Sequence, residues 1–464
     1  MPAHVLVGNR IGTRQNFPVL RLDRTRASAS ALLFASLVCA AALTSSCSEE
    51  KPKGTARPPR LVVLGLDAGT WQLLDKYFAR GILPNLARLR SQGASAVLNS
   101  IEPSSSPVIW TSIATGKVPD KHGITWFVRF PQGPGKPVPV DRRMRKTQAI
   151  WNMLSGRGMD VAVVGWFVTW PAEEVNGRLV SDMAHYGDLD GESFPPYFLR
   201  QLAPVEQSEA IRAMASFMDF PYDARRAIKA PGNEPPELDY LVYDRFIRAY
   251  TRDLFYLRAT ERVLSEPPLP DALFVYLRGT DDVQHGFWKF MDPEPFGNVP
   301  PDQVQQLGKV IENYWVWVDK RVGDILSRYK QPPMVLVVSD HGAGPAVGNF
   351  GVDVPEYLHL SGSHRPDGIL IANGPGVRKG VKLDPASIMD VTPTLLHYLR
   401  LPVGDDMDGT VRIDLFEDSV ADREIQRVPT YDKPGQAAGS VPTPIEPAVE
   451  GKVLEHLRSL GYIE

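Results

Sequence analysis

Residues 61–66 read Leu-Val-Val-Leu-Gly-Leu, and Asp67 follows them directly. Two later runs have the same character and also end near an aspartate: Leu-Phe-Val-Tyr-Leu at 273–277 before Asp281, and Val-Leu-Val-Val-Ser at 335–339 before Asp340. Short apolar runs rich in β-branched side chains are typical of strands buried on both faces, as in parallel sheets. Ligands of open α/β sheets collect at the carboxyl ends of such strands. We therefore expect three carboxylates to converge at one edge of a sheet.

Two histidines lie close to these aspartates in the chain. His285 comes four residues after Asp281, and His341 is adjacent to Asp340. Each polar residue has an ordinary explanation when taken alone, such as a strand-end turn or a helix histidine. Asp340 and His341 together are harder to explain in this way. They directly follow a buried strand, where two polar groups are costly unless they are paired or bind a metal. Mixed imidazole and carboxylate ligands favour zinc over magnesium.

Helix and strand signals alternate through residue 400, which predicts a doubly wound, mostly parallel α/β sheet flanked by helices. Helices are expected at 70–79, 84–92, 107–115 and 149–154, and strands at 94–101 and 161–165. Two apolar stripes predict long helices: Val242, Phe246, Tyr250, Leu254 and Leu257 in one, and Leu307, Ile311, Tyr314, Val318, Val322 and Ile325 in the other. The proline-dotted stretch 186–236 is expected to begin an inserted cap region.

Composition sets wide bounds on the class of protein. The chain has 464 residues, of which 43% are hydrophobic and 23% charged, so there is material for one large domain or two. A net charge of −3 gives no support for a nucleic-acid-binding surface. Both cysteines, Cys39 and Cys47, lie in the first fifty residues, so we expect no disulfide in the folded body.

The first residues are expected to direct export. Residues 31–43 are uncharged and follow several arginines, and this length suits the core of a signal peptide better than a spanning helix. Residues 43–47, Leu-Thr-Ser-Ser-Cys, resemble a relaxed bacterial lipobox, which makes Cys47 the lipidated residue of a periplasmic or cell-envelope protein. Ordinary cleavage that leaves a free cysteine is the alternative. The expected organisation is a signal peptide at 1–47, a tether at 48–59, a folded domain at 60–427, and a proline-rich linker with a short helix at 428–464.

Residues 104–116 read Ser-Ser-Ser-Pro-Val-Ile-Trp-Thr-Ser-Ile-Ala-Thr-Gly. Pro107 at the first helical position places Ser106 at the N-cap, where its hydroxyl faces free N–H groups and the positive end of the helix dipole. That position favours an alkoxide or a bound phosphate. The alternative is that Ser106 only caps the helix.

Several separated blocks of the chain resemble the alkaline phosphatase superfamily and, within it, the type I phosphodiesterase/nucleotide pyrophosphatase family. The blocks fall between about residues 60 and 410 and keep the family's order: 63–68, 106–116, 120–124, 280–285, 338–342, 362–368, 390–394 and 406–409. The resemblance implies an alkaline-phosphatase-like fold and a phosphoric diester hydrolase. Its substrate would be a small-molecule, lipid or glycan phosphodiester.

The resemblance also implies two zinc-binding sets with seven ligands in all: Asp281, His285 and His364 in one, and Asp67, Asp340, His341 and the Ser106 oxygen in the other. Three carboxylates and one alkoxide then balance the charge of two Zn²⁺ ions. Ser106 would be the nucleophile, and the reaction would pass through a phosphoserine.

Some residues depart from the family pattern or favour a rival. Ser106 stands where the family usually has Thr, Pro107 has no N–H, and Ile109 replaces an Asn that often holds a phosphoryl oxygen. Ile109 also stands where a sulfatase would have Arg, which argues against that reading. A phosphomonoesterase needs an added cation, and whether Arg278 or Lys117 supplies one is left open. A non-catalytic envelope binding protein is the remaining alternative. Among the other histidines, His122 is expected to be structural and His397 to lie in the core, whereas His185 and His359 have no motif support.

Overall fold

The computed structural model describes residues 60–130, 136–187, 189–227, 236–347, 360–432, 450–451 and 453–455. These residues belong to one compact unit, Arg57–Glu464. The predicted signal peptide at 1–47, the tether at 48–59, His359 and most of the proline-rich linker lie outside the described residues. Within the described ranges, no helix has the length and apolar character needed to cross a membrane.

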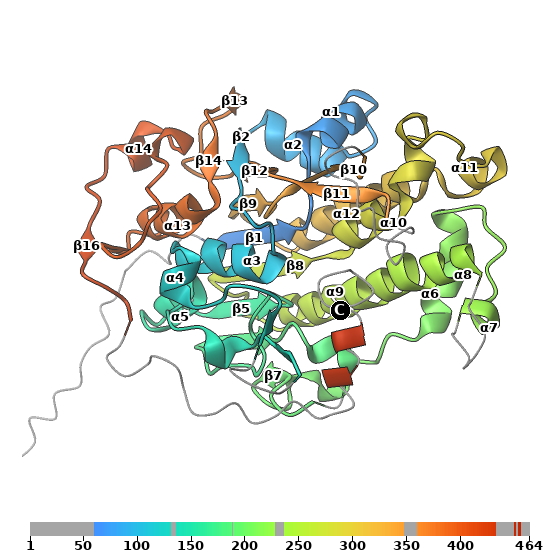
Figure 1. Cartoon of the computed structure of the whole chain (residues 1–464). Coiled ribbons are helices and arrows are strands. Elements are labelled where there is room, and N and C mark those ends of the chain that lie inside the picture. Colours follow the sequence, from blue (N-terminus) through green and yellow to red (C-terminus); the bar gives the residue numbers. More distant parts are fainter. Residues whose placement is uncertain are drawn as a thin grey trace, which may run out of the picture. The chain divides into compact units, whose positions relative to one another are not determined.

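A ten-stranded sheet forms the centre of this unit (Figure 1). Its order is β13 (Val381–Lys382), β2 (Ala94–Asn99), β12 (Asp367–Asn373), β9 (Met334–Val338), β1 (Leu61–Leu66), β8 (Ala272–Leu277), β5 (Val161–Val164), β6 (Gly177–Val180) and β7 (Ser193–Phe194), with β14 (Ala386–Ser387) also paired to β2. The five strands from β9 to β6 are parallel, whereas β12 and β7 run antiparallel to their neighbours. The predicted α/β class with a mostly parallel sheet is confirmed.

Helices cover both faces of the sheet, because both sets of alternate side chains on its strands are apolar. Val62 and Leu64 of β1 share one core with α1 (Trp71–Ala79), α2 (Pro84–Ser91), α9 (Arg248–Ser265), α10 (Gly279–Met291) and α12 (Val310–Leu326). Leu61 and Val63 share the other core with α3 (Ser106–Thr115), α5 (Ile150–Ser155) and α13 (Val391–Tyr398). This two-sided burial is the structural meaning of a doubly wound fold.

The first predicted long helix is continuous and the second is broken. The first consists of α8 (Glu237–Leu241), a π-helical segment η5 (Val242–Ile247) and α9, which follow one another directly. The second consists of α11 (Pro301–Leu307) and α12, with a turn between them. The apolar stripes of both are buried except for Leu254, so the predicted core faces are largely right. The first stripe begins with apolar residues four apart, at 242, 246 and 250, which suits the wider turn of a π-helix.

The described part of 186–236 folds into short elements that join the α9 side of the molecule. These are η3 (Phe198–Gln201), α6 (Gln207–Ala213), η4 (Met214–Ser216) and α7 (Ala224–Ala227), in addition to β7. Phe198, Met214 and Phe217 are buried in the same core as α9. That this region caps the site remains a prediction. Of the predicted C-terminal helix, residues 450–451 and 453–455 are described and are helical.

Candidate metal and nucleophile site

The carboxyl ends of three adjacent strands meet at one level. Leu66 of β1 is opposite Leu277 of β8, and Gly65 of β1 is opposite Val338 of β9. Each strand therefore ends beside its neighbours, and the acidic residues that follow enter the same space. The register therefore places the ends of these three strands side by side, as expected from the sequence.

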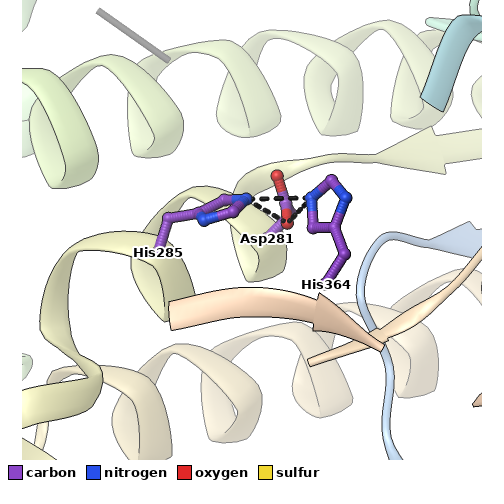
Figure 2. Close-up of side chains that lie close together, drawn as sticks. All are labelled: Asp281, His285 and His364. Atoms are coloured by element: carbon purple, nitrogen blue, oxygen red, sulfur yellow. Dashed lines mark hydrogen bonds and ion pairs between the residues drawn. The ribbon is translucent and has the colours of Figure 1, made fainter. Parts of the chain in front are cut away.

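Helix α10 and strand β11 (Gly362–Arg365) bring together the first group of candidate ligands. Figure 2 shows Asp281 and His285 on the helix with their side chains pointing toward His364 of the strand. Oδ1 of Asp281 lies 3.2 Å from Nε2 of His285 and 3.5 Å from Nε2 of His364. The two Nε2 atoms are 2.9 Å apart. The three side chains could therefore hold one metal ion.

A glycine allows β11 to approach α10 this closely. A Cβ at Gly362 would lie 2.2 Å from the carbonyl oxygen of Gln284, so any larger residue would push the strand away. The adjacent backbone is bonded to the helix, because the N–H of Ser361 donates to the carbonyl of His285 over 2.7 Å. Strand β11 is thereby fixed to the helix that carries two of the candidate ligands.

The second group lies in the buried space between β1 and β9. Nε2 of His341 is 3.4 Å from Oδ1 of Asp67 and 3.3 Å from Oδ2 of Asp340. Asp67, Asp281 and His341 also lie close enough together to bind one ion. Asp281 thus belongs to both groups, so the two candidate metal positions are adjacent.

All three histidines present an Nε2 atom to this space. Nδ1 of His285 bonds to the carbonyl of Gly362 over 2.8 Å, that of His341 to Gly342 over 3.0 Å, and that of His364 to Ser104 over 3.0 Å. A carbonyl only accepts, so each Nδ1 carries the proton, and in a neutral ring Nε2 then carries the lone pair that can bind a metal. A histidine that ligates a metal through one nitrogen usually donates its other N–H in this way.

Several buried atoms at the site have no hydrogen-bond partner within the described ranges: Oδ1 of Asp67, Oδ2 of Asp281, Oδ2 of Asp340, Nε2 of His341 and Oγ of Ser106. Buried groups of this kind are costly when left alone. The facing Nε2 lone pairs of His285 and His364 also repel each other unless a cation lies between them. The residues present therefore fit metal ions, and their mixed nitrogen and oxygen character fits zinc.

The buried carboxylates of the two groups have shifted pKa values. Burial, reinforced by the negative charge of Asp67, raises the pKa of Asp340 well above its ordinary value. Burial raises the pKa of Asp281, but the charge and hydrogen bonds of His285 and His364 hold that pKa well below the ordinary range when these rings carry a second proton on Nε2. Bound cations favour the charged form of both carboxylates.

Helix α3 begins one residue earlier than the sequence predicts. Ser105, not Ser106, is the N-cap, because the carbonyl of Ser105 accepts from the N–H groups of Val108 and Ile109 over 2.9 and 3.0 Å. Ser106 is the first helical residue, and Pro107 takes the second position, where its missing N–H costs no helical bond. Neither serine side chain caps the helix.

The start of α3 is nevertheless connected to the candidate ligands. The carbonyl of Ser104 accepts from Nδ1 of His364, so the strand that carries one ligand is bonded to the segment before Ser106. Trp110 anchors the same helix against β1, where a Cβ at Gly65 would lie 2.8 Å from the indole ring. The hydroxyls of Ser105 and Ser106 are both buried without partners among the residues described, so hydrogen bonding does not distinguish them.

Sequence reasoning did not identify three residues that support the site. The hydroxyl of Tyr276 donates to Oδ2 of Asp67, and Thr280 donates to the carbonyl of Asp67 over 2.6 Å. The amide of Gln284 donates to the carbonyl of Ala68 over 3.0 Å. Burial raises the pKa of the Tyr276 phenol well above its ordinary value, as does Asp67, so the phenol remains a donor. The sequence did contain a signal for Tyr276, because its hydroxyl is the one polar side-chain group in an apolar strand and lies one residue before the strand ends.

Lys117 and Ile109, two positions considered for contacts with the phosphoryl group, make other contacts in the structure. Lys117 is buried, and its Nζ lies 2.6 Å from carboxylate oxygens of both Asp406 and Asp432, so its charge is already balanced. Ile109 is fully buried in the core shared with α3, and its aliphatic side chain has no donor for a phosphoryl oxygen. Arg278, in contrast, directly precedes α10 and is buried next to the site.

The remaining histidines behave differently from the candidate ligands. His122 is buried and contacts Ser112 over 3.0 Å, and Nε2 of His397 contacts the carbonyl of Val420 over 3.1 Å inside the second core. These contacts agree with the structural and core roles expected for them. His185 contacts Tyr256 over 3.0 Å, away from both ligand groups.

Solved structures of other proteins share the fold. The fold is similar to that of a variant of the alkaline phosphatase PafA, with a TM-score of 0.50 and 14% identity over 78% of this chain and 100% of that one. Murine ectonucleotide pyrophosphatase/phosphodiesterase 5, in an inactive form with AMP, gives a TM-score of 0.46 and 14% identity over 77% of this chain and 100% of that one. The human protein of that name gives 0.46 and 12% over the same shares.

At these identities the likeness to solved structures concerns the fold. No curated protein matches the sequence significantly. Residues 61–406, however, match the family described as type I phosphodiesterase/nucleotide pyrophosphatase, and they include the ten strands of the central sheet and all seven candidate ligands. The chain therefore belongs to the type I phosphodiesterase/nucleotide pyrophosphatase family.

Proposed function

We propose that this phosphodiester hydrolase uses Ser106 as its nucleophile, two zinc ions and a phosphoserine intermediate. The observation that carries the proposal is the set of three histidines whose Nδ1 atoms are committed to backbone carbonyls and whose Nε2 atoms face one buried, acidic space. Family membership supports the reaction class. The metal identity and the nucleophile rest on the chemistry of the residues.

The proposed ligands form two sets, of which the first is the group on α10 and β11 and the second adds Ser106 to side chains that follow β1 and β9. Asp281, His285 and His364 would hold one zinc ion, and Asp67, Asp340, His341 and Oγ of Ser106 the other. Zinc at these positions would favour the ionised serine and offset negative charge on the phosphoryl and leaving oxygens. Three carboxylates and one alkoxide would balance the two cations, so the zinc-bound site would carry little net charge before the substrate binds.

The chain's own groups then account for the reaction in two displacements. Oγ of Ser106, having lost its proton to solvent, attacks phosphorus, and the bond from phosphorus to one alcohol oxygen breaks as that alcohol takes up a proton. Water next attacks the phosphoserine, the bond between Oγ and phosphorus breaks, and a phosphomonoester leaves. The net reaction consumes one diester and one water and yields one monoester and one alcohol.

A phosphomonoesterase is the second candidate. Monoesters bring an additional negative charge, and the described residues offer Arg278 as a buried guanidinium next to the site. Lys117, the other cation considered, is held by two aspartates. Family membership and the balanced charge of the ligand set favour the diester.

The proposal is tested with the purified full-length chain and bis-p-nitrophenyl phosphate. We expect about two zinc ions per chain by elemental analysis, loss of hydrolysis after chelation, and recovery on adding zinc. His285→Ala should reduce the zinc content, whereas His397→Ala, which changes a histidine outside the site, should not. Magnesium alone in the purified protein, with activity that survives zinc chelation, would contradict the proposal.

We also propose that the protein is exported and attached to a bacterial envelope membrane through a lipid on Cys47. The support is the sequence of residues 31–47, which precede the described part of the chain. Metabolic labelling with an alkyne fatty acid should label the wild-type protein and the Cys39→Ala variant but not Cys47→Ala. Labelling that is equal in the two variants, or absent from all three proteins, would contradict it.

A further inference from the structure

A small cavity lies beside the proposed zinc site, at the same edge of the sheet. Its walls come from residues that follow β5, β6 and β8, together with helix α9, and they include Phe167, His185, Arg252, Tyr276 and Arg278. The cavity has a volume of about 70 Å³. A cavity that holds a single water needs about 10–15 Å³, so there is room for a small polar group.

Tyr276 belongs to the cavity wall and also contacts a proposed ligand. The ring of Tyr276 forms part of the cavity wall, and its hydroxyl donates to Oδ2 of Asp67. Arg278, also in the wall, comes three residues before Asp281. A substrate held at the proposed zinc site would therefore have its next few atoms beside this cavity.

Arg278 has unmet hydrogen-bonding capacity. Its side chain is 7% exposed, and its Nε and Nη2 atoms have no hydrogen-bond partner in the described part of the chain. Oδ1 of Asp282 lies 3.9 Å from Nε of Arg278, which is beyond hydrogen-bonding distance. A buried guanidinium with free donors is costly, which indicates that a ligand completes its bonding.

The second arginine in the wall has a carboxylate partner at hydrogen-bonding distance. Arg252 donates to Oδ2 of Asp282 and lies 3.8 Å from Oδ1 of Asp253, although its Nε has no hydrogen-bond partner among the described residues. Of the two guanidinium groups, Arg278 is therefore the one whose side chain has no hydrogen-bonded carboxylate in the described part of the chain.

Asp182 is the acidic residue in the same wall, and its oxygens are occupied. They accept from the N–H groups of Val168 over 2.9 Å, Thr169 over 3.2 Å and Trp170 over 2.9 Å. The negative charge is thus compensated by donors of its own loop. It does not take up the free donors of Arg278.

We propose that Arg278 and this cavity bind a second anionic group of the substrate, a carboxylate or phosphate on one of its alcohol parts. The inference rests on the proposed phosphodiester hydrolysis and specifies its substrate class. A guanidinium pairs with the two oxygens of such a group through parallel hydrogen bonds. Arg278 is then a residue that determines specificity by contacting a part of the substrate away from the reacting phosphorus.

The test compares matched substrates and matched inhibitors on the zinc-loaded full chain. The substrates are p-nitrophenyl alkyl phosphodiesters whose alkyl arm of two, three or four carbons ends in a carboxylate or a methyl group. The inhibitors are methyl alkyl phosphinates with the same arms, which cannot be hydrolysed and whose binding is measured by calorimetry. For at least one arm length we expect the carboxylate form to have a kcat/KM about tenfold higher and a Kd about tenfold lower.

Arginine variants assign the preference to one residue. Arg278→Gln should bring both ratios to about one, and Arg278→Lys, which keeps the charge but loses the planar fork, should give intermediate ratios. Arg258→Gln, which changes an arginine of α9 that pairs with Glu209 outside the cavity, should leave the ratios unchanged.

Hydrolysis and binding of both series without preference at any arm length would overturn the inference while leaving the proposed function intact. A monoester advantage that disappears in Arg278→Gln would also overturn it, because Arg278 would then serve the reacting phosphoryl group. Failure to hydrolyse any diester would instead contradict the proposed function itself.

Discussion

On helix α10, Oδ1 of Asp281 lies 3.2 Å from Nε2 of His285, one helical turn further along. Residues four apart on a helix lie on the same face, so the backbone of a single element sets the separation of these two proposed ligands. His364 is brought to the pair by a strand whose backbone is bonded to that helix. A site assembled in this way is largely formed before a metal binds, which reduces the free energy needed to order it.

The choice of nucleophile can be tested by two neighbouring serines. Ser106→Ala should lower kcat for a phosphodiester by roughly 10³-fold or more, because it removes the attacking oxygen and a proposed zinc ligand. Ser105→Ala, which removes an equally buried hydroxyl at the N-cap, should lower kcat only slightly. Steady-state kinetics on both variants decides the matter, and equal losses would show that Ser106 has been misassigned.

Tyr276→Phe should weaken zinc binding by about tenfold. The phenol donates to Oδ2 of Asp67, and its removal leaves a buried carboxylate oxygen without that donor. Competition with a chromophoric chelator measures the change. Tyr329→Phe is the matched control, because the buried hydroxyl of Tyr329 has no hydrogen-bond partner within the residues described. Equal zinc affinity of the two variants would exclude a positioning role for Tyr276.

Phosphodiesters should be better substrates than monoesters of the same alcohol, by roughly tenfold or more in kcat/KM, or about 1.4 kcal/mol of differential transition-state binding. A monoester brings one more negative charge to a site whose carboxylates and alkoxide already balance two zinc ions. Lys117 cannot compensate it, because two aspartates hold its ammonium group. Both substrates should be compared on one enzyme preparation, and equal efficiency or a monoester advantage would place the protein with the phosphatases.

Stability should fall in acid partly because of His122. The N–H of Ile124 donates to Nδ1 of His122 over 3.2 Å, so the neutral ring carries its proton on Nε2 and donates to Ser112. Burial lowers the pKa of His122 to about 3, helped by Arg145, whereas the unfolded value is 6.5. Between these values the unfolded chain binds more protons, so the free energy of unfolding decreases as the pH falls from 6.5 toward 3.

The matched variant for this effect is His122→Asn. Its free energy of unfolding should change less between pH 6 and 4 than that of the wild type, by up to about 1.4 kcal/mol per pH unit. Between pH 7.5 and 8.5 the two curves should run parallel. Urea unfolding at each pH measures both quantities, and parallel curves across the acid range as well would refute the assignment.

Much of the site could be predicted from strand ends, because a parallel sheet places the residues after its strands at one edge. Asp67, Asp281 and Asp340 follow three runs that could be recognised by composition alone. His364 could not be found in this way. It lies within the short strand β11 instead of following a buried strand, and only the resemblance to a family indicated it.

The rest depended on contacts between distant segments, which composition and periodicity do not encode. The bond from Tyr276 to Asp67 spans 209 positions in the sequence, and the approach of Gly362 to Gln284 joins a hairpin to a helix. The helix start at Ser106 was predicted one residue late, since a proline is accepted at either of the first two helical positions. The π-helical segment at Val242–Ile247 depends on tertiary packing that overrides the regular turn.

Strand β12 runs against its neighbours β9 and β2, so it begins at the edge of the sheet where they end. Only Pro366 separates it from β11, which carries His364. β11 itself belongs to a separate two-stranded sheet with β10 (Gly342–Pro345), in which His364 is opposite Ala343 and successive residues point to opposite sides. A slip of one residue in this pairing would turn the imidazole out of the site, although every residue of the site would still be present.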